Sequence, residues 1–85
     1  MLVTVVHSPA CHLCDEAQEA LSRLAEDFPV RVELLDSRTP EGQRLVRAHR
    51  SALFPLVLLD GAYFSAGRLP RLKLRRLLER RTVGA

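Results

Sequence analysis

The sequence predicts an α/β fold with elements in the order β-α-β-α-β-β-α, forming a mixed four-stranded sheet of order 2-1-3-4 with helices on both faces. Three observations predict it. Two apolar runs, residues 2–6 and 55–59, are typical of buried strands. An amphipathic helical pattern follows the first run, and a two-residue hairpin signal, Asp60-Gly61, follows the second.

The first half of the chain contains a strand, a helix and a second strand. Residues 2–6 are apolar and mostly β-branched, which indicates a buried strand. From residue 12 apolar side chains recur at helical spacing, with charged residues between them, until Pro29 ends the helix. The apolar positions are Leu13, Ala17, Ala20, Leu21, Leu24 and Phe28. Residues 30–34 then alternate apolar with charged side chains, as a half-buried strand does.

A second helix is expected over residues 40–50. Thr39 is a suitable N-cap, and Pro40 stands at the first helical position, where proline is favoured. Gly42 weakens the helical pattern. Three arginines at three-residue spacing predict the exposed side of this helix: Arg44, Arg47 and Arg50.

The last part of the chain contains a strand, a hairpin and a helix. Residues 55–59 form the second apolar strand, and Asp60-Gly61 turns the chain into a short strand over residues 62–65. A final helix is expected over residues 70–81. Leu72 falls off the apolar stripe of this helix, so we expect it to be partly exposed; the stripe consists of Leu74, Leu77 and Leu78.

The polarity of the strands predicts their order. The first and third strands are apolar on both faces, so they belong in the middle of the sheet. The second strand carries Arg31 and Glu33, which suits an edge, and the fourth strand is short. A right-handed crossover makes the first two strands parallel, and the hairpin makes the last two antiparallel.

Composition limits the class of protein. The 85 residues, 47% hydrophobic and 27% charged, predict one domain over residues 1–85 and argue against a disordered chain or a coiled coil. No apolar run is long enough to span a bilayer, and residues 2–6 are too short for a signal-peptide core. We therefore expect a cytoplasmic monomer that does not bind a membrane. The low aromatic content argues against stacked single-stranded nucleic acid.

Basic residues are concentrated at the end of the chain. Residues 68–85 hold seven basic side chains against Glu79 alone, a net charge of +6, whereas residues 1–67 hold six basic and nine acidic side chains, a net charge of −3. This pattern fits either a solvated helix face or a binding module that docks a protein or nucleic acid through its basic C-terminal helix.

The two cysteines lie where the first strand gives way to the first helix. Residues three apart share a helix face, so Cys14 is expected beneath Cys11, within disulfide reach. The helix N-terminus favours an anion, which lowers the pKa of a thiol placed there. Cys11 is thus the expected nucleophile and Cys14 the expected resolving thiol in thiol–disulfide exchange. His12 either adds positive charge near Cys11 or faces solvent.

A metal site and two inert core thiols are the alternatives for this cysteine pair. A structural zinc site needs four ligands, typically from two cysteine pairs or from one pair and two histidines. The chain has no second pair, and its histidines do not stand at zinc-finger spacing: His7, His12 and His49. We therefore predict no metal site. The position at the start of a helix argues against inert core thiols.

These motifs resemble those of the glutaredoxins of the thioredoxin superfamily. The resemblance rests on the C-x-x-C of residues 11–14, the Phe54-Pro55 step, the Asp60-Gly61 hairpin and the turn at Gly67. It implies a dithiol–disulfide oxidoreductase with a cis-proline at Pro55 beside the cysteines. It also implies that the backbone of the residue before that proline binds substrate. The substrate-binding residues that we expect are His12, Leu13, Phe54, Pro55 and Gly67.

Three departures from the glutaredoxin pattern concern glutathione. The family usually has Pro-Tyr between the cysteines, where this chain has His12 and Leu13. A basic residue usually stands where Ser8 does, and an aspartate usually follows the glycine turn, where residues 68–70 contain no acid. We therefore expect no tightly bound cofactor and weak turnover with glutathione as co-substrate. The expected substrate is a disulfide in a protein or small molecule, with a reductase or glutathione as electron donor.

Overall fold

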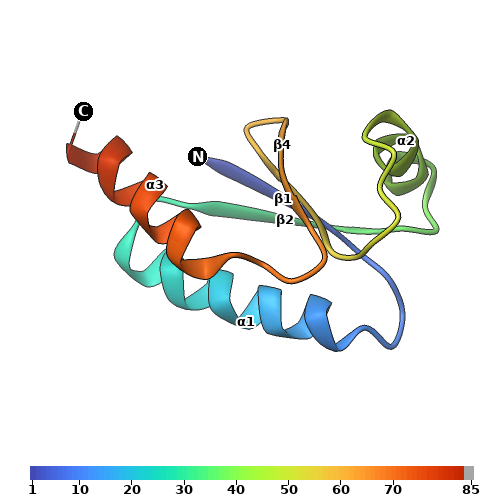
Figure 1. The fold of residues 1–85 in the computed structure, drawn as a ribbon, viewed down its shortest axis with the longest axis horizontal. Helices are drawn as coiled ribbons and strands as arrows, with labels where there is room; N and C mark the ends of the chain where they lie inside the picture. The colour runs from blue at the N-terminus through green and yellow to red at the C-terminus, as the bar shows by residue number, and fades with distance from the viewer. Residues whose placement is uncertain (84–85) are drawn as a thin grey trace.

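A computed structural model describes residues 1–83 and contains the seven expected elements in the expected order (Figure 1). They are β1 (Leu2–His7), α1 (His12–Asp27), β2 (Arg31–Asp36), α2 (Pro40–Ala48), β3 (Leu56–Leu59), β4 (Ala62–Ala66) and α3 (Arg71–Val83). The predicted boundaries agree to within about two residues, as expected for helix and strand ends.

The sheet has the predicted order, β2-β1-β3-β4. β1 runs parallel to β2, with partners from Leu2 and Arg31 to His7 and Asp36. β3 runs antiparallel to both β1 and β4. The two apolar strands β1 and β3 are therefore central, and β2 and β4 lie at the edges, which confirms the predicted order, although β4, with five residues, is not shorter than β3, with four.

Helices cover both faces of this sheet. α1 and α3 lie together on one face and α2 lies on the other (Figure 1). Alternate side chains of β1 consequently belong to two cores: Val3 and Val5 pack with α1 and α3, whereas Val6 packs with α2. β3 divides in the same way, with Val57 and Leu59 in the first core. Burial on both faces explains why these strands are continuously apolar.

β2 departs from the simple alternating pattern. Val32 packs against the core beneath α1, but Leu34, on the same face, is 49% exposed. Leu35, on the opposite face, packs against the core beneath α2. The alternation of apolar and charged side chains over residues 30–34 predicts a buried Leu34. The difference arises because an edge strand has a neighbouring strand on one side only.

α3 carries the predicted stripe. Leu74 and Leu78 are 0% and 4% exposed, whereas Leu72 is 60% exposed, as expected from its position off the stripe. Within residues 1–83, none of the helices combines the length and the apolar character that crossing a membrane requires.

α2 begins as predicted but uses its glycine in an unexpected way. The Thr39 hydroxyl caps the helix by accepting the N–H of Gly42 at 3.1 Å. Gly42 is buried, and a Cβ there would lie 3.0 Å from the carbonyl carbon of Asp36 and from Cα of Ser37, and nearer still to the Asp36 carbonyl oxygen. This glycine therefore lets α2 pack directly onto the backbone that leads out of β2.

The Asp60-Gly61 turn links three parts of the fold. Both residues have positive φ, 48° and 85°, as a tight hairpin requires. The Asp60 carboxylate accepts the Leu2 N–H at 2.8 Å and pairs with Arg81 of α3 at 3.0 Å. These contacts, led by the Leu2 N–H, lower the pKa of Asp60. The turn thereby connects β1, the β3–β4 hairpin and α3.

Candidate active site

Cys11 is the N-cap of α1. Its backbone is extended, with φ −114° and ψ 104°, and its carbonyl accepts the first helical hydrogen bond, from Asp15 N at 3.1 Å. Its sulfur accepts the N–H of Cys14 at 3.1 Å. A side-chain oxygen usually makes this capping contact. Here a sulfur atom takes that place, at the end of the helix where N–H groups and the dipole favour negative charge.

Cys14 lies one turn into α1 and forms a disulfide bond with Cys11, so the structure shows the oxidised pair. The two Cα atoms are 5.2 Å apart, which confirms the disulfide reach predicted from their spacing. Cys14 is 1% exposed and Cys11 is partly exposed. An incoming molecule can therefore reach the sulfur of Cys11 more easily than that of Cys14.

The loop before β3 faces this disulfide. The Phe54–Pro55 peptide bond is cis, as the resemblance implied, and Pro55 is buried. The carbonyl oxygen of Phe54 lies 4.0 Å from Sγ of Cys11. The Phe54 side chain packs partly against the core beneath α2. The backbone of Phe54 is thus held next to the accessible sulfur.

Gly67 connects the end of β4 to the same loop. Its N–H donates to the Pro55 carbonyl at 3.1 Å, and its φ of +89° lies in the left-handed region that favours glycine. A Cβ at Gly67 would lie 3.3 Å from Cδ1 of Leu53. Gly67 therefore holds the proline loop and leaves space for Leu53.

Leu53 is a site residue that the sequence did not single out. It is 60% exposed and directly precedes Phe54. A lone leucine in a loop carries no periodic signal; the structure places its side chain against Gly67, and the next residue, Phe54, has its carbonyl 4.0 Å from Sγ of Cys11. Leu53 thus provides exposed apolar surface on the loop whose Phe54 carbonyl faces Cys11.

Direct contacts join five of the seven expected site residues, and the other two lie between the cysteines. The five are Cys11, Cys14, Phe54, Pro55 and Gly67. His12 and Leu13 occupy the first two helical positions of α1. His12 is exposed and Leu13 is partly buried, so both lie close to the disulfide through the chain itself.

The residue after the glycine turn is a base rather than an acid. Arg68 is exposed and its guanidinium lies 3.8 Å from the carboxylate of Glu16 on α1. Ser8, at the position where the family usually has a base, is partly buried. The basic residue and the acidic residue that are usual in glutaredoxins are therefore absent from positions 8 and 68 of this chain.

Several basic side chains of α3 make contacts within the molecule. Lys73 lies over the ring of Phe64 at 5.6 Å, and Arg75 lies over the ring of Phe28 at 5.5 Å. Arg81 pairs with Asp60, as described above. Part of the C-terminal positive charge thus serves the packing of α3. Among residues 1–83, no three histidine, cysteine or acidic side chains are grouped so that they could hold a metal ion.

Comparison with solved structures shows the fold. A mutant thioredoxin from Halobacterium salinarum matches 93% of this chain and 72% of its own, with a TM-score of 0.66 and 22% identity. The oxidised form of mitochondrial thioredoxin 3 from Saccharomyces cerevisiae matches 93% and 76% of the two chains, with a TM-score of 0.64 and 19% identity. No family model and no curated protein matches the sequence. The chain has the thioredoxin fold.

Proposed function

We propose that this protein is a thiol–disulfide oxidoreductase in which Cys11 is the nucleophile and Cys14 the resolving thiol. The position of the Cys11 sulfur supports the proposal most: it caps α1 and lies 4.0 Å from the Phe54 carbonyl oxygen, on a residue that is partly exposed. The thioredoxin fold of the chain is consistent with this chemistry.

The first step needs the reduced protein with Cys11 as a thiolate. The Cys14 N–H and the end of the α1 dipole stabilise negative charge on that sulfur. The thiolate attacks one sulfur of a substrate disulfide, forming a mixed disulfide with Cys11 and expelling the other substrate sulfur as a thiolate.

The second step returns the protein to the form seen in the structure. The Cys14 thiol is deprotonated and its sulfur attacks Sγ of Cys11, which breaks the mixed disulfide; the second substrate sulfur leaves as a thiolate and takes up a proton in exchange for the one that Cys14 lost. Two electrons pass from the cysteine pair to the substrate, and the Cys11–Cys14 disulfide forms. Burial of Cys14 favours this intramolecular role, because few external disulfides can reach it.

Substrate is held, in this proposal, by the loop that faces the disulfide. An extended segment next to Cys11 can form hydrogen bonds with the backbone of Phe54, while the exposed Leu53 supplies an apolar contact. Pro55 and Gly67 act by fixing that loop. His12 and Leu13 flank the substrate from the first turn of α1.

The electron donor is either a reductase or glutathione, and we propose that glutathione works poorly. Ser8 offers no positive charge, and Arg68 stands where an acid is usual in the family. We place the reaction in the cytoplasm, because a reducing compartment keeps a dithiol reduced.

Reduction of insulin by dithiothreitol tests the proposal. The wild-type protein should accelerate precipitation of the insulin chains, and Cys11→Ser should abolish the acceleration. Full turnover by Cys11→Ser would refute the assignment of the nucleophile. Coupling the wild type separately to glutathione reductase with glutathione and to thioredoxin reductase then identifies the donor, and efficient turnover with glutathione would contradict the expectation of weak binding.

A further inference from the structure

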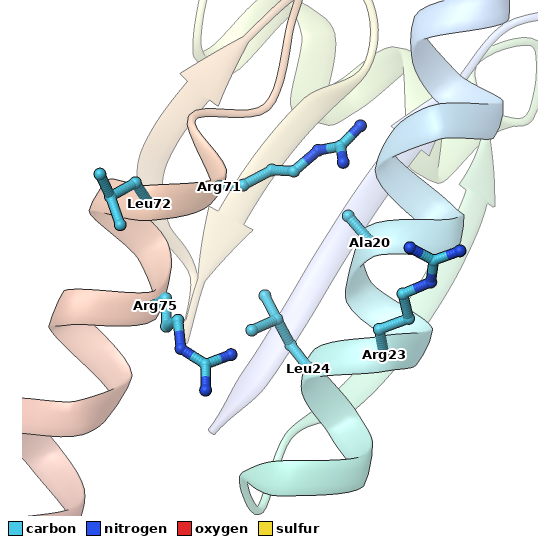
Figure 2. Close-up of a pocket in the computed structure, with 6 residues that line it drawn as sticks. All are labelled: Ala20, Arg23, Leu24, Arg71, Leu72 and Arg75. Carbon is cyan, nitrogen blue, oxygen red and sulfur yellow. The ribbon is translucent and has the colours of Figure 1, made fainter.

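A groove separates α1 from α3 on the face of the molecule that both helices cover. Its volume is about 310 Å³. Figure 2 shows Arg71 and Arg75 reaching from α3 toward the side of α1 that carries Ala20 and Leu24. The lining residues of this α1–α3 groove are Ala20, Arg23, Leu24, Arg71, Leu72 and Arg75.

The groove combines an apolar floor with an apolar rim. Ala20 and Leu24 form the floor and are each 7% exposed, whereas Leu72 on α3 is 60% exposed. An exposed leucine beside a hollow leaves apolar surface in contact with water, and covering it with another apolar side chain is favourable. The occupant should therefore bring an apolar side chain.

The charges that line the groove are all positive. Arg23 pairs with Glu19 at 2.7 Å and Arg75 lies 3.8 Å from Asp27, while Arg71 makes no salt bridge with any part of the chain that the structure describes. Exposed ion pairs of this kind are weak, so carboxylates of a partner can compete for these guanidinium groups. The occupant should therefore be acidic as well as apolar.

A second hollow extends the groove toward the active-site loop. It has a volume of about 240 Å³, and Arg71 lines both hollows. Arg68 and Glu16, which form an exposed ion pair at 3.8 Å, also line the second hollow, and Arg68 directly follows Gly67, whose N–H is bonded to Pro55. A chain of contacts thus leads from the disulfide through the proline loop to the groove. One bound peptide can occupy both places.

We propose that the α1–α3 groove binds an acidic segment with an apolar anchor in the protein whose disulfide is presented to Cys11. This inference rests on the proposed function and adds the class of substrate. Ala20 and Leu24 follow Cys11 by nine and thirteen positions, so at 1.5 Å per residue the groove lies about 14–20 Å from the disulfide. An extended peptide covers that distance in roughly four to six residues.

Kinetics with three synthetic peptides test the proposal. Each has one cysteine, held as a mixed disulfide with 2-mercaptoethanol, and a segment Glu-Leu-Glu, Lys-Leu-Lys or Glu-Ser-Glu five residues away. The reduced protein converts each peptide to its thiol, releasing 2-mercaptoethanol and forming the Cys11–Cys14 disulfide, which dithiothreitol reduces again. At low salt, kcat/KM for Glu-Leu-Glu should exceed that for Lys-Leu-Lys about fivefold to tenfold. Glu-Ser-Glu should fall between them.

Charge reversal on α3 supplies the matched variants. Arg71→Glu should remove the preference for the acidic peptide, whereas Arg76→Glu should keep it, because Arg76 is exposed on the same helix and does not line the groove. Equal kcat/KM values for the three peptides would overturn the proposal, because the protein would then select neither charge nor the apolar anchor. Equal effects of the two variants would overturn it too, because the preference would then depend only on the net charge of α3.

A binding measurement separates this proposal from the proposed function. Fluorescence anisotropy of labelled peptides with serine in place of cysteine reports on the groove without any redox step. Binding of the acidic peptide that Arg71→Glu weakens supports the groove, even if no peptide disulfide is reduced. A single-stranded oligonucleotide of equal net charge should bind less well because it lacks the anchor, and tighter binding of the oligonucleotide would refute the choice of partner.

Discussion

Replacement of Gly42 by alanine has two effects of opposite sign on the free energy of unfolding: a gain in helix propensity and a steric overlap. In a helix interior alanine is favoured over glycine by about 1 kcal/mol. Gly42 is the third residue of α2, so propensity alone predicts a more stable protein by up to about this amount. The structure predicts the reverse, because the new methyl group would overlap the backbone of Asp36 and Ser37. Overlap with a flexible side chain is relieved by rotation, whereas these atoms move only if α2 shifts as a whole.

The net effect should be a loss of stability. Overpacking costs about 1–3 kcal/mol, and contact with rigid backbone belongs to the upper part of that range. After the propensity gain, Gly42→Ala should lower the free energy of unfolding by about 1–2 kcal/mol, measured by urea denaturation followed by circular dichroism. Arg47→Ala on the exposed side of α2 is the control and should change it by less than about 0.5 kcal/mol. A Gly42→Ala protein more stable than wild type would refute the close packing of α2.

Three further predictions concern the core, the hairpin turn and the cysteines. Leu74→Ala should cost about 2–5 kcal/mol in urea denaturation, whereas Leu72→Ala should change stability by less than about 0.5 kcal/mol; equal effects would contradict the buried stripe of α3. The pKa of Asp60 is lowered in the folded protein, so its charge stabilises the fold above the unfolded pKa of about 3.9 and stops doing so as pH falls through the folded value. The stability difference between wild type and Asp60→Asn should therefore be constant from about pH 5 to 7 and shrink below about pH 4; a constant difference down to about pH 2 would contradict a stabilising role of the Asp60 contacts with Leu2 and Arg81. In the reduced protein, iodoacetamide should modify Cys11 faster than Cys14 at pH 7, as followed by peptide mass spectrometry, and faster modification of Cys14 would contradict their assigned exposure.

The fold could be predicted from the sequence because its strongest signals are local. The two apolar strands at residues 2–6 and 55–59 carry apolar side chains on both faces. These side chains leave water only if both faces are covered, which places the strands in the centre of the sheet. The Asp60-Gly61 turn requires positive φ at two positions, and the sequence offers residues that adopt it. The sheet order follows from these constraints together with the handedness of crossovers.

The features that escaped prediction depend on contacts between distant residues. Gly42 weakens a helix by propensity, and only the approach of Asp36 reveals why glycine stands there. Leu34 fits a buried pattern but lies on an edge strand that is only partly covered. Leu53 becomes part of the site through Gly67, fourteen positions later in the chain.

The candidate site likewise has features that the local sequence predicted and features that depend on distant parts of the chain. The spacing of Cys11 and Cys14 at a strand–helix junction predicted their proximity and the position of Cys11 at the helix end. The approach of the proline loop to the sulfur was expected only from the resemblance to a family. The α1–α3 groove had no signal in the sequence, because its lining comes from two helices separated by about half of the chain.

Trapping of the mixed disulfide is the most direct test of the proposed chemistry. Reduced Cys14→Ser protein, incubated with a disulfide-bonded peptide and acidified, should carry the peptide on Cys11, as identified by intact mass and peptide mapping. The Cys11→Ser protein should carry little or none, because Cys14 is buried. Absence of the adduct on Cys11, or equal trapping by Cys14 in the Cys11→Ser protein, would contradict the assignment of Cys11 as nucleophile and Cys14 as resolving thiol.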